Sequence, residues 1–448
     1  MEISQQKSKY MKNILFMAFI TSILLGCQSN NEGGANLFSN NQIIISDDIT
    51  HFWEAYDAIN STDDTLVQLE FLQTLFLDKA SHGQQKMIEA RRYTATEYLE
   101  SIKTRALFWN SIRPNTENLE EYNKQLKAGV DKLAAIYPSL KMSKIYYTMG
   151  NFRSPGTGMD SIVLIGAEYA LGDSTINTSE LPEHVQKYYK INPVDRLEFL
   201  TVHEYIHTQQ KAMVHDLLPL TLYEGIAEFM AILATGQKSP SKAFEVGASN
   251  GERVKHRFEQ DLFMPNTIFS WLWNSSENEF QTNDMSYFVG SKIASLYYDK
   301  ATDKEQAIKK LIELDYSNEA QVEEIVDGTE YFSGSLGALS EDFESQRPIV
   351  ISVDPINADD SLMAGRKVIT VHFSQTMNIE RRGFDYGPLG EDHVLRVEKV
   401  IGFSEDAKSF SFEVDVMENR HYQSTITSSF RSASGYPVKP YLIDFNTK

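Results

Sequence analysis

The amino-acid sequence predicts an α+β protein in which a mainly helical region is followed by an all-β sandwich. Three observations support this prediction. Apolar residues recur every three or four positions through much of residues 46–345, the period of α-helices that pack one face against a core. After Pro348 the pattern changes to short runs of β-branched and aromatic residues separated by turn residues. The chain has 448 residues, 42% of them hydrophobic, so it is long enough to form two cores.

The composition excludes several classes of protein. The chain carries 62 acidic and 42 basic residues, a formal net charge of -20, which repels phosphate backbones, so we expect no nucleic-acid partner. There is one cysteine. A single sulfur builds neither an internal disulfide, nor a cysteine-rich zinc site, nor an iron–sulfur cluster. The cysteine must therefore be interpreted from its position.

The cysteine directly follows an apolar segment near the start of the sequence. Three lysines precede the apolar run 14–25, which has the length of a signal-peptide core and is short for a membrane span. The run ends in Leu-Leu-Gly-Cys at 24–27, which resembles the bacterial lipobox, where cleavage precedes a cysteine that receives acyl chains. The resemblance implies a signal peptide at residues 1–26 and lipid attachment at Cys27. The alternative is an uncleaved anchor helix with an incidental cysteine.

The residues after the cysteine bear on location. Residues 27–45 include a stretch rich in Asn, Ser and Gly without apolar periodicity, which predicts a flexible tether. Gln28 stands where an aspartate would resemble an inner-membrane retention signal, so the sequence favours the outer membrane. We expect lipid, rather than basic side chains, to hold this acidic protein at a membrane of the bacterial cell envelope.

The first predicted helix begins near Asp47, with Asp47 or Asp48 available as its cap. One face of this helix carries Ile49, Phe52, Trp53, Tyr56 and Ile59. Helical periodicity continues to about Tyr137. Two strands are predicted next, at Lys144–Thr148 and Ser161–Ala167. The segment between them is rich in turn residues but lacks the spacing of a phosphate-binding loop, so we expect a hairpin-like connection.

The residues with catalytic chemistry lie between 192 and 229. Asn192 is a suitable helix cap and Pro193 suits the first helical position, so the sequence predicts a helix from Pro193 to near His215. This helix carries His203-Glu204-Tyr205-Ile206-His207, an H-E-x-x-H motif. Residues four apart share one helical face, so both imidazoles can reach one metal ion. Glu204 lies beside that ion and can accept a proton from a water that the metal activates.

A zinc ion needs a third protein ligand. A second apolar helix is predicted to run to about Thr235 and to stop at Gly236, and it begins with Leu-Tyr-Glu-Gly-Ile-Ala at 222–227. The motif pair resembles the gluzincin metallopeptidases, which combine H-E-x-x-H with a glutamate on a following helix. The resemblance implies that His203, His207 and Glu224 bind zinc and that Glu204 is the general base. Glu228, one turn further, would orient a histidine by a hydrogen bond.

Other assignments are weaker or remain open. His215 would be the third ligand in a metzincin-like pattern, but Gln210 and Met213 occupy positions where that pattern needs Gly and His. Glu228 is the alternative to Glu224 as the third ligand. Two solvated histidines on a surface helix, or a zinc site that is structural or inactive, are the alternatives to a catalytic centre.

Two further roles come from resemblance. Ser286-Tyr287-Phe288-Val289-Gly290 resembles a Tyr-x-x-Gly segment of such peptidases, and Tyr287 is the candidate donor to the oxyanion of the tetrahedral intermediate. A tyrosine that only packs in the core is the alternative. Gluzincins hold the substrate backbone along an edge strand, and Ser161–Ala167 is the segment expected to do so here.

Residues 301–345 return to a helical period, with an apolar stripe at Ile308, Leu311, Ile312 and Leu314. Six β-rich runs follow, at Ile349–Val353, Lys367–Phe373, Val394–Val400, Ser409–Val416, His421–Ile426 and Tyr441–Phe445. They predict an antiparallel sandwich in which Phe373 and Met377 belong to the core. The segments at 371–378 and 434–447 resemble a bacterial immunoglobulin-like domain, which would cover residues 348–448.

The whole chain resembles predicted zinc-dependent protease lipoproteins, with a zincin-like metallopeptidase domain at residues 46–345 and an Ig-like sandwich at 348–448. This resemblance implies a membrane-anchored zinc hydrolase that cleaves a peptide or protein substrate. The alternative hypothesis is a non-enzymatic envelope lipoprotein whose metal site is structural or vestigial and which acts in assembly or ligand binding.

Overall fold

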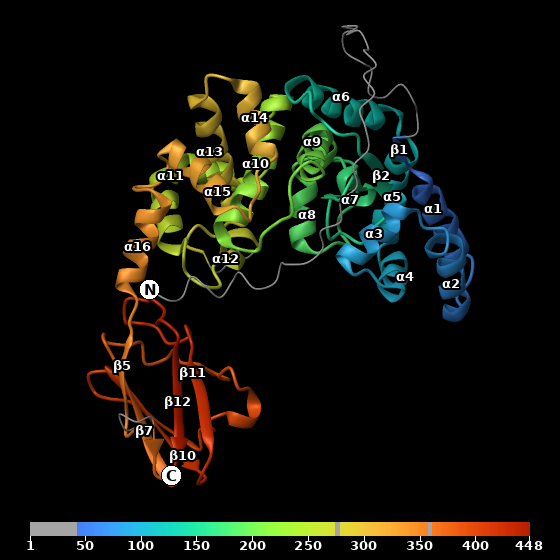
Figure 1. Cartoon of the computed structure of the whole chain (residues 1–448). Coiled ribbons are helices and arrows are strands. Elements are labelled where there is room, and N and C mark those ends of the chain that lie inside the picture. Colours follow the sequence, from blue (N-terminus) through green and yellow to red (C-terminus); the bar gives the residue numbers. More distant parts are fainter. Residues whose placement is uncertain (1–42, 274–277, 357–360) are drawn as a thin grey trace, which may run out of the picture. The chain divides into compact units, whose positions relative to one another are not determined.

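The computed structural model describes residues 43–273, 278–356 and 361–448. The predicted signal peptide (1–26), Cys27 and the tether as far as residue 42 lie outside the described residues. The described part is an α+β protein: helices and one small sheet occupy residues up to 346, and two further sheets occupy the remainder (Figure 1). The α+β class predicted from the sequence is therefore confirmed.

The first helical segment forms as its periodicity predicts. Its elements are α1 (Asp47–Ile59), α2 (Thr65–Leu72), η1 (Gln73–Leu77), α3 (His82–Arg91), α4 (Ala95–Thr104), α5 (Ala106–Glu117) and α6 (Glu120–Ile136). The five apolar residues predicted to share one face of α1 are all buried.

The predicted cap of α1 was wrong. The cap position belongs to Ser46, whose side chain makes no capping hydrogen bond. Asp48 is fully buried, and its carboxylate accepts hydrogen bonds from the backbone N–H of Ser81, at 2.8 Å, and from the Ser81 hydroxyl. The Asp48 carboxylate therefore binds the residue before α3 and is not available to cap α1.

A four-stranded sheet, in the order β1-β2-β4-β3, lies between the helices. Its strands are β1 (Ile44–Ile45), β2 (Lys144–Thr148), β3 (Gly156–Met159) and β4 (Ile162–Gly166). Both predicted strands are confirmed, and they pair in parallel. The segment between them is more than a turn, because its second half is β3, which pairs antiparallel with β4.

This topology corrects the predicted edge strand. The segment 161–167 is mainly β4, which is paired on both sides and buried along its whole length. The edge strands of this sheet are β1 and β3. A segment with two glycines in four residues has low strand propensity, so sequence pattern alone does not indicate it.

The second helical segment comprises α7 (Ala167–Ala170), α8 (Glu183–Tyr189), η2 (Pro193–Arg196), α9 (Leu197–His207), α10 (Leu217–Thr235), α11 (Lys242–Asp261), α12 (Ile268–Leu272), α13 (Met285–Lys300), α14 (Lys304–Ile312), α15 (Glu319–Thr329) and α16 (Leu336–Gln346). The end of α10 at Gly236, in the left-handed conformation with φ of 71°, is as predicted. The apolar stripe predicted on α14 and just after it is buried.

The helix that carries the H-E-x-x-H motif begins and ends at other residues than the sequence predicts. Asn192 has a left-handed backbone (φ 54°) and caps nothing, because its side chain bonds the N–H of Ser174 and the carboxylate of Asp195. Residues 193–196 form a 3-10 turn before α9 starts. The helix ends at His207 rather than near His215, since Thr208 and Gln209 instead bond Ser143 and Lys141 in the segment before β2.

Among the described residues, α10 is the one helix long and apolar enough to cross a membrane. Two thirds of its most apolar window is buried inside the protein, and it carries Glu224 and Glu228 on its length. These features are typical of the core helix of a folded domain.

The β-rich part contains β5 (Val350–Asp354), β6 (Ser361–Leu362), β7 (Gly365–Phe373), β8 (Phe384–Asp385), η4 (Glu391–His393), β9 (Lys399–Phe403), β10 (Ser409–Val416), β11 (His421–Ile426) and β12 (Tyr441–Thr447). One sheet has the order β5-β7-β10-β9 and the other β6-β12-β11-β8. Buried side chains from both sheets form a single core, which includes Phe373 and Met377 as predicted. The pairing is antiparallel except between β6 and β12, which is parallel.

One predicted strand of this part is displaced. The run 394–400 becomes a crossing segment followed by β9, because the N–H of Leu395 bonds Gln423 in one sheet and that of Glu398 bonds Glu413 in the other. A segment that passes between two sheets cannot pair along its whole length with either.

A buried carboxyl supports the loop between β2 and β3. Glu168 on α7 is fully buried, and its carboxylate accepts the backbone N–H groups of Gly150 at 2.9 Å and Phe152 at 3.2 Å. Burial raises the pKa of Glu168 to about 7, against its ordinary value of 4.5, although these hydrogen bonds oppose the shift.

This pKa shift predicts a pH-dependent stability. The folded protein binds the Glu168 proton more tightly than the unfolded chain, so the contribution is complete below pH 4.5 and is lost as the pH rises through 7. We expect the unfolding free energy of the wild type, relative to Glu168→Gln, to fall by up to about 3 kcal/mol from pH 4.5 to pH 8. Urea unfolding at both pH values measures it, with Glu120→Gln on an exposed residue as control. A difference independent of pH would contradict the prediction.

Candidate metal centre

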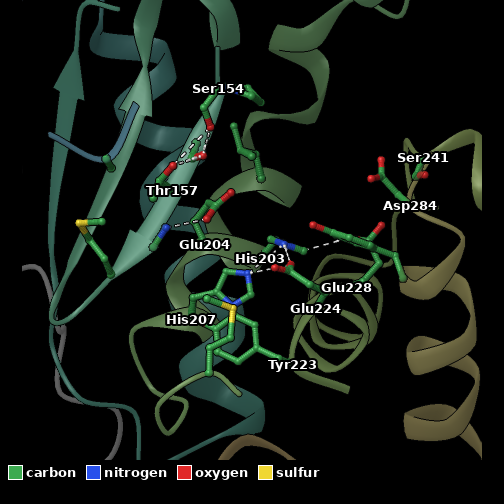
Figure 2. A pocket seen from close by; sticks show the side chains of 18 of the residues that line it. Ser154, Thr157, His203, Glu204, His207, Tyr223, Glu224, Glu228, Ser241 and Asp284 are labelled. Carbon is green, nitrogen blue, oxygen red and sulfur yellow. Dashed lines mark hydrogen bonds and ion pairs between the residues drawn. The ribbon is translucent and has the colours of Figure 1, made fainter. Parts of the chain in front are cut away.

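The neighbouring helices α9 and α10 bring three metal-binding side chains together. His203 Nε2 lies 3.2 Å from His207 Nε2 and 3.6 Å from Glu224 Oε2, and His207 Nε2 lies 3.3 Å from the same oxygen. Figure 2 shows the three side chains facing one another. We call His203, His207 and Glu224 the three-donor cluster. Sequence reasoning proposed this set, and the structure brings its members within 4.8 Å of one another.

The spacing of the cluster fits a tetrahedral ion. Donor atoms about 2.0–2.1 Å from a common centre at tetrahedral angles lie about 3.3–3.4 Å apart. The three measured separations, 3.2, 3.3 and 3.6 Å, scatter around that value. All three residues border a cavity of about 1160 Å³, so there is space for a water or substrate group beside them. The residues present therefore suit a metal that keeps one exchangeable position.

Each histidine has a polar partner near its other ring nitrogen. His203 Nδ1 lies 2.9 Å from Glu228 Oε2, the pair of residues that the sequence predicts, although the angles at this contact are not those of a hydrogen bond. His207 Nδ1 lies 2.7 Å from Gln210 Oε1. Gln210 in turn donates to the backbone oxygen of Tyr223 and to the hydroxyl of Tyr316, each at 2.8 Å. A donor hydrogen on Nδ1 leaves Nε2 free to bind a metal.

The contact of Gln210 with His207 was not predicted from the sequence. Gln210 was considered there only as a residue that does not fit the metzincin pattern. It lies three residues after His207 but beyond the end of α9. Because its contact depends on the loop conformation and on the distant Tyr316, no helical periodicity indicates it. Its close position in sequence to a candidate ligand was the only available signal.

The charges around the cluster favour a cation. Burial alone would lower the pKa of His203, but hydrogen bonds to Glu224 and Glu228 raise it well above its ordinary value. Burial alone would raise the pKa of Glu224, but the two histidines hold it well below its usual range. Asp284 also lines the cavity, and burial together with the charges of Glu224 and Glu228 raises its pKa to about 7. Several carboxylates thus surround two imidazoles, and a divalent ion would offset this negative potential.

Glu204 lies outside the three-donor cluster and is held by the edge strand. Its Oε2 accepts a hydrogen bond from the backbone N–H of Gly158 on β3, at 2.7 Å (Figure 2). A methyl group on Gly158 would lie 2.1 Å from the backbone oxygen of Glu204, so only glycine allows β3 to approach α9 this closely. The Gly-rich segment therefore positions Glu204, a role its sequence alone did not indicate.

A tyrosine ring stacks on each imidazole. Tyr287 of α13 is parallel to His203 within 4°, with ring centroids 6.0 Å apart, and Tyr223 is parallel to His207 within 10° at 4.5 Å. Burial, followed by the charges of Glu224 and Asp284, raises the pKa of Tyr287 well above its ordinary value. Its hydroxyl therefore stays protonated at the border of the cavity. Tyr223 was not singled out from the sequence.

Two glycines allow α10 and α13 to carry Glu224 and Tyr287 to the same place. A methyl group on Gly225 would lie 2.3 Å from the Cα of Gly290, and one on Gly290 would lie 2.0 Å from the backbone oxygen of Thr221. The helix backbones are thus in direct contact at this crossing. These are the glycines of the Glu-Gly-x-Ala and Tyr-x-x-Gly segments. Each segment thus contains one candidate site residue and one glycine that the helix crossing requires.

His215 is not part of the three-donor cluster. It lies in the loop between α9 and α10 and borders the cavity at another place. The predicted substrate strand 161–167 does not border the cavity, whereas all four residues of β3 do.

No protein-family model and no curated protein matches this chain. Among solved structures it is similar to domains 1–6 of the surface layer protein SbsC, with 12% identity, a TM-score of 0.18, and coverage of 59% of this chain and 37% of that one. The S-layer protein rSbsC(31-844) has the same identity and TM-score, with coverage of 90% and 45%. The chain spans less than half the length of these two structures. TM-scores this low do not define a common fold, so no function is transferred from them.

The helix crossing yields a stability prediction. We expect Gly290→Ala to lower the unfolding free energy by about 1–3 kcal/mol, because the added methyl group separates two backbones in contact. The control is Gly328→Ala on α15, where a Cβ meets nothing within 4 Å and alanine is favoured in a helix by about 0.5–1 kcal/mol. Urea unfolding of both variants checks this. Equal effects at the two glycines would contradict it.

Proposed function

We propose that this protein is a zinc-dependent metallopeptidase of the gluzincin type, with a zincin-like domain at about 46–345. The observation that carries the proposal is the tetrahedral spacing of His203, His207 and Glu224 beside a cavity that also contains Glu204. Two imidazoles and one carboxylate with an open fourth position are the ligand set of hydrolytic zinc sites. Zinc is preferred over magnesium or calcium, since those ions take oxygen ligands.

The chain's own residues fit the roles that peptide hydrolysis requires. When bound, zinc would polarise the scissile carbonyl and lower the pKa of a water to about 7. Glu204 would accept the proton of the attacking water and pass it to the leaving amine. Gly158 limits the movement of that carboxylate through its 2.7 Å hydrogen bond. Glu228 and Gln210 hold the two imidazoles in the required orientation.

Tyr287 is our candidate for stabilising the oxyanion. Its raised pKa keeps the hydroxyl as a hydrogen-bond donor, and its ring is fixed against His203. The edge strand β3 borders the cavity, so an extended peptide could add to it as a further strand. This proposal moves the substrate-binding strand from 161–167 to 156–159.

Three parts of the sequence interpretation stay predictions. The Ig-like character of residues 348–448 is proposed from motifs and is supported by the two sheets that share a core. Lipid attachment at Cys27 and placement in the outer membrane rest on sequence alone. They imply that cleavage takes place at the cell envelope.

The test of the proposed function combines metal content with peptide cleavage. We expect purified wild type to bind one zinc per chain, measured by mass spectrometry, and to cleave peptides in a randomised library. Glu204→Gln should retain zinc and lose about 10²–10⁴-fold in kcat, because it lacks the general base. Glu183→Gln on an exposed residue is the control.

Two results would oppose the proposal. Absence of stoichiometric metal after growth in zinc-supplemented medium would remove the metal centre. Bound zinc without cleavage of any peptide would instead favour a structural site in a protein of assembly or ligand binding.

A second prediction concerns Gln210. We expect Gln210→Ala to weaken zinc affinity by about 10–100-fold, because His207 loses the partner that fixes its orientation. Gln209→Ala is the matched control, since Gln209 bonds Lys141 and Thr208 but neither histidine. Competition with a chelating dye measures both affinities. If Gln210→Ala binds zinc as tightly as Gln209→Ala, Gln210 does not support the site.

A further inference from the structure

Arg91, the last residue of α3, is half-buried and borders the cavity beside β3. Its Nη2 donates to the hydroxyl of Ser154, at 3.0 Å, and to that of Thr157. Its Nε is buried and has no hydrogen-bond partner among the residues that the structure describes. Both partners of this charged group are therefore neutral hydroxyls, and one of its buried donors is unsatisfied.

Arg91 also lacks a counter-charge. Among the described residues, none of the carboxylates forms an ion pair with it, although acidic residues outnumber basic residues by 62 to 42 in the chain. Arg153 donates to the backbone oxygen of Arg91 at 2.8 Å, so a second guanidinium lies close by. Arg153 itself is paired with Glu97. A partly buried charge without an opposite charge is unfavourable, and the deficit is removed when an anion binds.

Arg91 lies where it could contact a peptide that binds along the edge of β3. Cβ atoms at Gly156 and Gly158 would meet Glu204, so these two residues face α9. Strand side chains alternate between faces, so Thr157 faces the opposite way, toward Arg91. A peptide added to the β3 edge alternates in the same manner. Its side chains on one face would approach Glu204 and those on the other face Arg91.

We propose that Arg91 forms a subsite for a carboxylate of the bound peptide. The inference rests on the proposed peptidase function and adds a substrate class to it, namely peptides with an anionic group near the cleaved bond. With Nη2 bonded to two hydroxyls and Nε buried, Nη1 is the donor left for a ligand. A charged guanidinium bonds a carboxylate more strongly than a neutral amide. The carboxylate could belong to an Asp or Glu side chain or to the carboxyl terminus of the peptide.

Three sets of randomised decapeptides distinguish these sources. The first set contains one Glu and has an amidated carboxyl terminus, the second replaces that Glu with Gln, and the third has the Gln with a free carboxyl terminus. We expect wild-type kcat/KM to be at least about 10-fold higher for one of the two carboxylate-containing sets than for the second set. Equal values for all three sets would overturn the proposal.

Variants of Arg91 assign the preference to this residue. Arg91→Gln should remove the preference for the carboxylate set, and Arg91→Lys should retain only part of it, because lysine keeps the positive charge but lacks the guanidinium that Ser154 and Thr157 hold in place. Arg92→Gln is the matched control, since Arg92 is exposed and does not border the cavity. If Arg91→Gln lowers kcat/KM equally for all peptide sets, Arg91 only supports Ser154 and Thr157. That result would contradict the subsite.

A binding measurement separates this inference from the proposed function. Fluorescence anisotropy of labelled peptides with Glu204→Gln protein measures affinity without turnover. One outcome is that wild type cleaves no peptide, yet the carboxylate set binds at least about 10-fold more tightly than the second set and Arg91→Gln abolishes this difference in affinity. In that case the peptidase proposal fails and the subsite holds. If peptides are cleaved without such a preference, the subsite fails and the peptidase proposal holds.

Discussion

The close approach of backbones at glycines is the constraint on which the candidate site depends. Gly225 and Gly290 let α10 and α13 touch, and Gly158 lets the edge strand β3 touch α9. Each contact lies next to a polar side chain of the site: Glu224 precedes Gly225, Tyr287 lies one turn before Gly290, and Glu204 bonds the N–H of Gly158. Larger residues at these positions would move the elements apart and separate the side chains they carry.

This packing assembles a preorganised set of partners around two imidazoles. Each ring has a stacked tyrosine on one face and a polar group near Nδ1, so both Nε2 atoms point toward Glu224. Fixed orientation reduces the reorganisation needed when a ligand binds. His207 is contacted by Gln210 from the loop after α9, which Tyr316 holds, and by Tyr223 of α10. The partners of His203 come from α10 and α13, so four segments must be in place for one site.

The edge strand β3 relates the reactive side chains to a second region of the cavity. Its two glycines face Glu204, and Thr157 between them faces Arg91. Because the two faces of this strand meet different side chains, the proposed catalytic group Glu204 and the proposed recognition group Arg91 do not compete for the same space. In a chain of negative net charge, the guanidinium of Arg91 is distinct from its surroundings, because it forms no ion pair within the described part of the chain.

Sequence alone determined the α+β class, most of the helices and strands, and the identity of His203, His207, Glu224 and Glu228 as residues that share a location. The class, the elements and the shared face of His203 and His207 rest on periodicity and on spacing along single helices, which are local properties. Glu224 and Glu228 were inferred from the resemblance to gluzincins. The tertiary structure decided where α9 ends, that β3 rather than β4 is the edge strand, and that Gln210, Tyr223 and Arg91 belong to the site. The end of α9 and the places of Gln210 and Arg91 depend on contacts between segments far apart in the chain: Ser143 with Thr208, Gln210 with Tyr316, and Arg91 with Thr157. The strand β3 pairs with the adjacent β4, but its glycines hide it from local propensity. The sequence pattern of one segment does not indicate which distant groups will form hydrogen bonds with it. For that reason these features could not be predicted from local sequence.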